Sequence, residues 1–270
     1  MEKDEIIIES AEKLINSSKI KNNIRKNKNI HISEIDIDKK NSEKLGKNQG
    51  KYITIFYSAL EGCVETLLKE LESSIKTILK YLNIKKNDKI LIVGLGNKNI
   101  TSDSLGYNVV EKIDIDNNIY KIYKEVEAIS NINTYDFVKI LSKKLNANLI
   151  IVIDSLKANN IERLNKTIQI SSGGICPGSA FNKNMIELSK KTLKIPVIAI
   201  GVPTIINMKE FLSVKTKEDL VVTSKDIDLE IENISTLLSI AINRVLWHKT
   251  CNFSLSLYYN SNKGECYEKI

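Results

Sequence analysis

The stretch Leu91–Ile113, LIVGLGNKNITSDSLGYNVVEKI, indicates the fold class of the chain. It begins with an apolar run, turns at the closely spaced Gly94 and Gly96, and continues through polar residues to Asp103. After Asp103 the apolar residues recur at helical spacing. The stretch therefore predicts a buried strand, a tight turn and a helix. Such a unit is typical of α/β proteins.

The glycine turn matches part of the sequence pattern of a nucleotide-binding loop but lacks the residues that define such a loop. A dinucleotide fingerprint needs a third glycine, and this chain has Asn99 at that position. No lysine and serine or threonine follow in P-loop order, which excludes that loop as well. What remains is a turn in which Thr101, Ser102 or Asp103 caps the next helix. From the pattern alone, a cap and a catalytic role both stay open for Asp103.

Strand and helix patterns alternate along the rest of the chain. The predicted strands are Asn29–Ile37, Lys51–Ser58, Lys89–Val93, Tyr120–Ala128, Asn148–Asp154, Thr167–Ile170 and Pro196–Val202. The predicted helices are Glu5–Ile20, Leu60–Leu82, Ser104–Ile113, Thr134–Leu145, Asn184–Leu193 and Lys225–Leu246. Near-continuous apolar strands between helices predict a three-layer α/β fold, with a mostly parallel sheet covered by helices on both faces.

We expect one α/β domain in residues 29–249. An N-terminal helix and connector precede it in residues 1–28, and a loosely attached tail follows in residues 250–270. The stretch Asn41–Gly50 has turn composition. The basic run Lys19–His31 is interpreted as a solvated connector rather than a binding patch.

Composition narrows the classes of function. The net charge is +7, but nearly all of the positive charge is lysine, and the arginine fork that reads phosphates and guanines is scarce. We therefore expect no direct nucleic-acid binding. The apolar runs are far shorter than the about 20 residues that span a bilayer. The N-terminus carries acids where a signal peptide has basic residues. These features predict a cytoplasmic protein without a membrane segment.

Cysteine and histidine are too few, and too widely spaced, for the common metal sites. The four cysteines show no C-x-x-C spacing, and the chain has only two histidines. We expect no metal and no cofactor. A thiol nucleophile at Cys176 is disfavoured because no histidine lies near it in sequence.

Two aspartates are the candidate catalytic residues. Asp103 follows the glycine turn, and Asp154 ends a predicted strand, so both are expected at the crevice beyond the carboxyl ends of the sheet. Two carboxyl groups in a partly desolvated cleft have separated pKa values, so one can activate water while the other donates a proton. Backbone N–H groups of the turn would stabilise the oxyanion. A divalent cation on both carboxylates, and a purely turn-forming role for Asp154, remain open.

Long phrases of this sequence resemble the spore germination protease family. They are LIVGLGNKNITSDSLG, VIDSLKANNIERLNKTIQIS, GGICPGSAFNKNMIELSKKTLKIPVIAIGVPTII and VVTSKDIDLEIENISTLLSIAINRVL, with EKLGKNQGKYITI as a lead-in. The resemblance extends, with gaps, from about Asn29 to Trp247.

The resemblance implies an endopeptidase that degrades small acid-soluble spore proteins during germination. It implies a fold like that of hydrogenase-maturation peptidases, a homotetramer made as a zymogen, and location in the forespore or spore core. The family's proposed catalytic aspartates match Asp103 and Asp154. The expected substrate and oxyanion region consists of Gly94, Gly96, Asn97, Gly178 and Ser179.

The chain departs from the family pattern at several points. The family's glycine-rich loop between the two aspartates is missing, and the propeptide region is expected to be only a few residues long. Ser102 replaces a proline, Asn159 an arginine, and Cys176 a histidine. These departures leave a second interpretation open, a degenerate relative that binds spore proteins or sister subunits without cleaving them. A third is a metal-sensing maturation peptidase.

Overall fold

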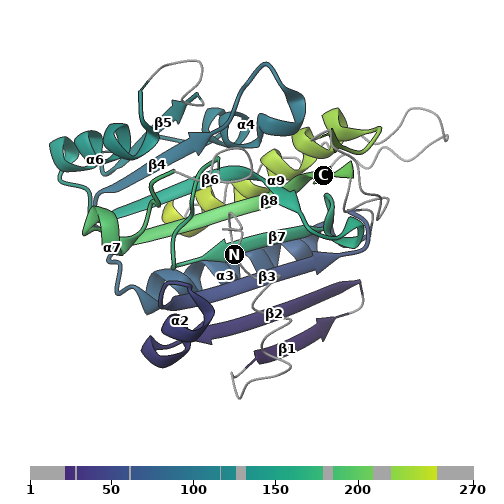
Figure 1. Ribbon diagram of the computed structural model, residues 1–270, viewed down its shortest axis with the longest axis horizontal. Coiled ribbons are helices and arrows are strands. Elements are labelled where there is room, and N and C mark those ends of the chain that lie inside the picture. The colour runs from purple at the N-terminus through teal and green to yellow at the C-terminus, as the bar shows by residue number, and fades with distance from the viewer. Residues whose placement is uncertain are drawn as a thin grey trace.

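The computed structural model describes residues 22–27, 29–60, 62–115, 117–125, 132–178, 185–208 and 220–247, which form a β-sheet between two layers of helices (Figure 1). The strands are β1 (Asn22–Asn27), β2 (Ile30–Ile37), β3 (Gly50–Tyr57), β4 (Ile90–Leu95), β5 (Ile119–Lys124), β6 (Leu149–Ala158), β7 (Thr167–Ser171), β8 (Val197–Asn207) and β9 (Val221–Val222). The helices are α2 (Lys39–Leu45), α3 (Val64–Tyr81), α4 (Leu105–Glu111), α6 (Thr134–Leu145), α7 (Lys190–Leu193) and α9 (Ile227–Trp247). Two 3-10 turns, η1 (Thr101–Asp103) and η2 (Ile161–Arg163), complete these elements.

The sheet is parallel in one half and antiparallel in the other. Its order is β1-β2-β3-β7-β8-β6-β4-β5, with β9 paired to β8. The pairs β4–β5, β4–β6 and β6–β8 are parallel, and the remaining pairs are antiparallel. The predicted α/β class is confirmed, but the sheet is mixed rather than mostly parallel. A continuous apolar strand indicates burial on both faces and does not fix the direction of its neighbours.

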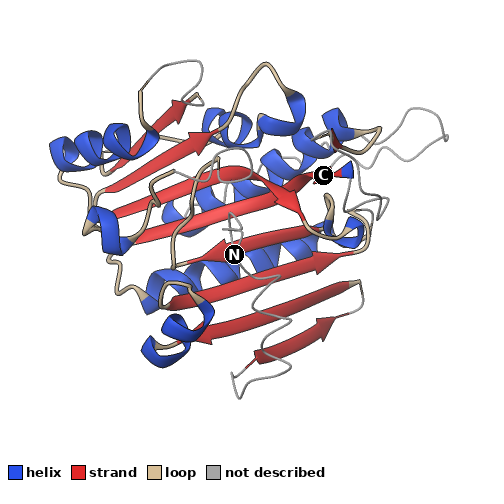
Figure 2. Ribbon diagram, viewed as in Figure 1, coloured by secondary structure: helices blue, strands red, loops and turns tan. Residues whose placement is uncertain are grey.

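Helices cover both faces of the sheet, as predicted. Helices α3, α4 and α9 pack on one face against strand residues such as Ile53, Ile92 and Ile151. Helices α2, α6 and α7 pack on the other face against the alternate residues, such as Leu91 and Val152. Figure 2 shows α3 and α9 running behind the sheet. Alternation along each strand therefore divides the apolar residues between two cores.

Three local predictions were wrong. The run Lys19–His31 is not only a connector, because residues 22–27 form β1 and pair antiparallel with β2. The turn-like stretch Asn41–Gly50 contains most of α2, which Asp38 caps by accepting the Asn41 N–H at 2.8 Å. The helix predicted for Asn184–Leu193 is confined to α7, because Leu188 instead forms a β-bridge with Ile175.

Several other predictions fall wholly or partly outside the described residues. They are the helix Glu5–Ile20, the tail in residues 250–270, Ser179, and the end of the strand predicted for Tyr120–Ala128. Within the described ranges, no helix is long and apolar enough to cross a membrane.

Candidate active site

The turn after β4 is built so that Asp103 folds back onto it. Gly96 has φ 115°, and a Cβ at this position would lie 2.0 Å from the carbonyl oxygen of Asp103. Only glycine fits such a contact without a shift of the backbone. The backbone N–H of Asn97 then donates to Asp103 twice, to its carbonyl oxygen at 3.1 Å and to its Oδ2 at 2.8 Å. The turn thereby fixes the orientation of the carboxylate.

This geometry excludes one of the two interpretations of Asp103, the helix cap. The N-cap residue of α4 is Ser104, which makes no side-chain cap hydrogen bond, and η1 has no side-chain cap either. The Asp103 carboxylate accepts from Asn97, which precedes it in the chain. The interpretation of Thr101, Ser102 or Asp103 as a helix cap is therefore wrong. The Asp103 carboxylate belongs to the glycine turn.

A hydrogen bond from β8 anchors η1. The Thr204 hydroxyl donates to the carbonyl oxygen of Ser102 at 2.6 Å, and Thr204 is fully buried. On the other side of the turn, Ser104 Oγ donates to the Thr101 carbonyl oxygen at 2.8 Å. The backbone on both sides of Asp103 is therefore tied down.

Asp154 lies within β6, not at its end. The strand continues to Ala158, so the predicted strand Asn148–Asp154 was too short. The parallel ladder between β6 and β4 stops at the pair Gly94–Ile153, and Asp154 is the next residue. On its other side, Asp154 pairs with Gly201 of β8. Asp154 is 5% exposed, so its carboxyl group is buried beside the point where β4 ends.

Two glycines bring the turn and β6 together. A Cβ at Gly106 in α4 would lie 2.6 Å from the carbonyl oxygen of Ile153 and 2.4 Å from the backbone nitrogen of Leu95. A Cβ at Gly94 would lie 2.2 Å from the carbonyl oxygen of Gly106. The helix that begins just after Asp103 therefore rests directly on the strand position before Asp154.

The environment raises the pKa of Asp103 to about 6, from a usual value of 3.8. Burial is the main cause, because a desolvated carboxylate is less stable than the neutral acid. The hydrogen bond from the Asn97 N–H acts in the opposite direction. A carboxyl group with a pKa near 6 can gain and lose its proton close to neutral pH, which is the range that suits general acid–base catalysis.

The expected substrate and oxyanion region is divided between two loops. Gly94, Gly96 and Asn97 lie together at the end of β4, and the Asn97 N–H is already used by Asp103. Gly178 lies in a separate loop after β7 with φ 65°, and, among the described residues other than its chain neighbours, only Met185 Cε would lie within 4 Å of an added Cβ. That loop packs through Ile175 into the core on the α6 side of the sheet.

Sequence reasoning missed three residues of this neighbourhood: Gly106, Thr204 and Tyr123. A glycine within the helical pattern at Gly106 was an available signal of close packing. Tyr123 has no local signal, because parallel pairing of β5 with β4 brings it beside Gly94.

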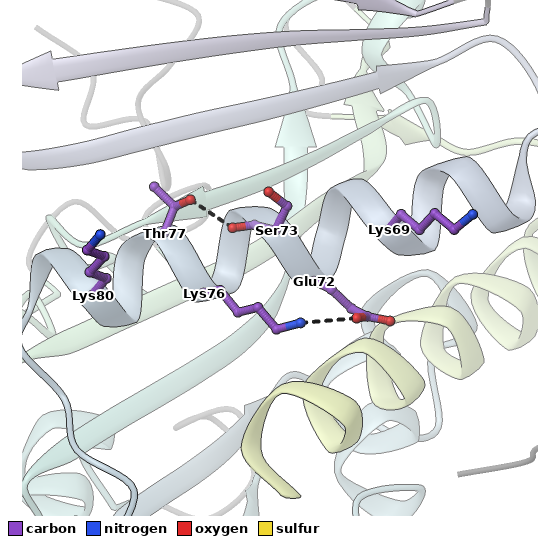
Figure 3. A pocket seen from close by; sticks show the side chains of 6 residues that line it. All are labelled: Lys69, Glu72, Ser73, Lys76, Thr77 and Lys80. Atoms are coloured by element: carbon purple, nitrogen blue, oxygen red, sulfur yellow. Dashed lines mark hydrogen bonds and ion pairs between the residues drawn. The ribbon is translucent and has the colours of Figure 1, made fainter. Parts of the chain in front are cut away.

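The outer face of α3 carries a shallow hollow that we do not assign to the active site. Its lining residues are Lys69, Glu72, Ser73, Lys76, Thr77 and Lys80 (Figure 3). Glu72 contacts Lys76 at 3.4 Å and Arg244 of α9 at 3.3 Å. Neither candidate aspartate lines the hollow, and exposed lysines on a helix are ordinary solvated side chains. Among the described residues, no group of three or more histidine, cysteine, aspartate or glutamate side chains is arranged to hold a metal ion.

Comparison with known proteins shows to which family the chain is related. A germination protease from Oceanobacillus iheyensis is 36% identical over 203 residues, covering 67% of this chain and 54% of that protein. One from Priestia megaterium is 36% identical over 233 residues, covering 77% of this chain and 62% of that protein. The chain thus spans little more than half the length of these relatives.

The solved structure of the [NiFe] hydrogenase maturation protease HycI from Thermococcus kodakarensis KOD1 matches with a TM-score of 0.37 and 15% identity, over 59% of this chain and 92% of that one. The model of the family described as germination protease matches residues 1–217, which is most of the sequence. On that match, the chain belongs to the germination protease family.

Proposed function

We propose that this chain is an endopeptidase that cleaves small acid-soluble spore proteins during germination. Membership of the germination protease family supports a peptidase. The substrate class follows from the resemblance of the sequence to that family. The chain spans 54% to 62% of the length of these relatives. We propose that it shares the activity of the whole proteins.

In the proposed mechanism, Asp103 and Asp154 divide the proton transfers of hydrolysis. Asp154 is assigned the role of the base, which takes a proton from the water whose oxygen attacks the scissile carbonyl carbon. Protonated Asp103 gives its proton to the leaving amine as the carbon–nitrogen bond breaks. The pKa of Asp103 near 6 supports its role as the proton donor. A water nucleophile requires no serine, cysteine or histidine.

The observation that carries this proposal is the contact of Gly106 with the Ile153 carbonyl oxygen. It joins the turn bearing Asp103 to the strand bearing Asp154. We assign substrate and oxyanion binding to the surrounding backbone, with Gly94, Gly96, Gly178 and Ser179 as the candidate positions. Asn97 acts there by orienting Asp103, because its N–H is already donated.

The proposal extends to the setting of the enzyme. By resemblance to the family, we infer a homotetramer made as a zymogen, acting in the cytoplasm of the forespore or in the spore core. No cofactor, direct nucleic-acid contact or membrane partner enters the proposed reaction.

A second candidate is a relative that binds spore proteins or sister subunits without cleaving them. The absence of the family's glycine-rich loop between Asp103 and Asp154 in the sequence favours it. Under this alternative, the two aspartates serve the structure of the turn and strand.

Cleavage of a purified small acid-soluble spore protein separates the two candidates. The full chain is incubated with the spore protein at about pH 6, and fragments are identified by mass spectrometry. We expect discrete fragments from the wild type, and cleavage that is slower by about 100-fold or more from Asp103→Asn or Asp154→Asn at unchanged circular dichroism. Asp136→Asn is the matched control, because this exposed aspartate lies in α6, and it should cleave normally.

Complete cleavage by either active-site variant would contradict the proposed mechanism. A wild type that binds the spore protein and releases no fragments would instead establish the second candidate.

A further inference from the structure

The hydroxyl of Tyr123 holds the backbone on both sides of Asn97. It lies 3.3 Å from the carbonyl oxygen of Gly96, to which it donates, and accepts the backbone N–H of Lys98 at 3.2 Å. Gly96 and Lys98 are the immediate chain neighbours of Asn97. The N–H between them is the one that donates to the Asp103 carboxylate. A single phenol thus spans the peptide segment that orients the candidate catalytic acid.

The fold gives Tyr123 a fixed approach to this turn. Its strand β5 runs parallel to β4, and Tyr123 pairs directly with Gly94, two residues before Gly96. Its ring packs edge-on against Tyr107 of α4, with the ring centroids 4.9 Å apart. The ring is therefore held by packing, and the hydroxyl is free to act on the turn.

We propose that Tyr123 is a positioning residue for Asp103, clamping the Gly96 carbonyl and the Lys98 N–H so that the Asn97 N–H stays on the Asp103 carboxylate. For its catalytic consequence this inference rests on the proposed function. Tyr123 transfers no proton in the reaction and acts only through the turn.

The clamp requires a neutral phenol, because only the protonated Tyr123 hydroxyl can donate to the Gly96 carbonyl oxygen. Glu125 Oε1 also lies 3.3 Å from the Tyr123 hydroxyl and competes with Gly96 for its single proton. Burial raises the pKa of Tyr123, the hydrogen bond from the Lys98 N–H acts in the opposite direction, and the charges of Glu125 and Asp103 raise the pKa further. The phenol therefore keeps its proton. The Lys98 side chain extends over the Tyr107 ring, with Nζ 6.0 Å from the ring centroid.

Tyr123→Phe tests the proposal, because it removes the hydroxyl and keeps the ring against Tyr107. Asp103 titration is followed by carboxyl carbon NMR and by the Asn97 amide proton, in the full chain. We expect the Asp103 pKa to rise by roughly 0.5–1 unit, because the carboxylate loses the donor that opposes desolvation. The Asn97 amide proton should lose most of its response to Asp103. Cleavage should become slower through kcat, with KM little changed.

Tyr120→Phe is the matched control, because Tyr120 lies in the same strand and packs on the opposite face of the sheet. It should leave the Asp103 titration unchanged. An unchanged Asp103 titration in Tyr123→Phe would overturn the inference. The NMR titration needs no peptidase activity, so a wild type that fails to cleave counts against the proposed function alone.

Discussion

Gly106 of helix α4 packs directly against the carbonyl oxygen of Ile153 in strand β6, and no side chain separates them. Asp103 precedes this helix and Asp154 follows Ile153 in the chain. A side chain at position 106 would force the helix and the turn away from the strand. The approach of the two candidate catalytic segments therefore depends on a residue that has no chemistry of its own.

Gly106→Ala should destabilise the protein. The added Cβ meets backbone atoms of Leu95 and Ile153 at 2.4–2.6 Å, so the backbone must shift. Overpacking of this kind, less the better helix propensity of alanine, predicts a loss of about 2 kcal/mol in the free energy of unfolding. Urea denaturation measures it. Gly62→Ala is the control: apart from its chain neighbours, no atom of the described residues lies within 4 Å of an added Cβ, and its φ of 70° opposes the change. An equal or smaller loss for Gly106→Ala than for Gly62→Ala would contradict the packing argument.

Asp103→Asn should stabilise the folded protein at neutral pH. The pKa of Asp103 is about 6 in the folded state against 3.8 as the usual value, so the folded state binds this proton more tightly. Between those two values the folded state holds the proton that the unfolded chain has lost, so this group's contribution to stability falls as pH rises. Above about pH 6, burial of the ionised Asp103 carboxylate therefore destabilises the folded state by its full amount. The pKa difference of about 2 units between the folded and unfolded states corresponds to about 3 kcal/mol.

Chemical denaturation of Asp103→Asn and wild type at pH 7.5 and pH 4.5 checks this. We expect a gain of about 2–3 kcal/mol at pH 7.5 that shrinks as the pH falls below about 6. Asparagine can still accept the Asn97 N–H, so the turn keeps its hydrogen bond. If the variant is less stable than wild type at pH 7.5, or if its gain in unfolding free energy does not depend on pH, then burial of the Asp103 carboxylate does not destabilise the fold as argued.

Thr204→Val should loosen η1 without changing the shape of the core. Valine keeps the volume of threonine but removes the hydroxyl that donates to the Ser102 carbonyl oxygen at 2.6 Å. An acceptor left unpaired beside buried β8 costs about 1–3 kcal/mol. We expect that loss in denaturant unfolding, together with slower cleavage. Thr204→Ser restores the hydroxyl and should recover most of both quantities; failure to recover either one argues against this hydrogen bond as the anchor.

The sequence predicted the parts of the fold that depend on local periodicity. The apolar spacing from Leu60 to Leu82 predicted α3, and Leu91–Ile113 predicted β4, the glycine turn and α4. These elements are recognisable because one continuous stretch carries the whole pattern. The same stretch identified Asp103 as a candidate residue, although the pattern could not distinguish a helix cap from a catalytic role.

Features that depend on distant pairing were not predictable in this way. The antiparallel half of the sheet exists because β3 pairs with β7, far along the chain, and no local pattern encodes that choice. Strand β1 was missed because its side chains from Asn23 to Asn27 are exposed, so it has no apolar alternation. Tyr123 reaches the turn only through the β4–β5 pairing.

The cooperation of Asp103 and Asp154 is tested most directly by a double-variant cycle on cleavage. kcat/KM is measured for wild type, Asp103→Asn, Asp154→Asn and the double variant with one spore-protein substrate at one pH. If the two acids act as a unit, each single change should lower kcat/KM by about 100-fold or more, and the double change should be little worse than either single one. Losses that simply multiply in the double variant, or a single variant that keeps wild-type kcat/KM, would contradict the account.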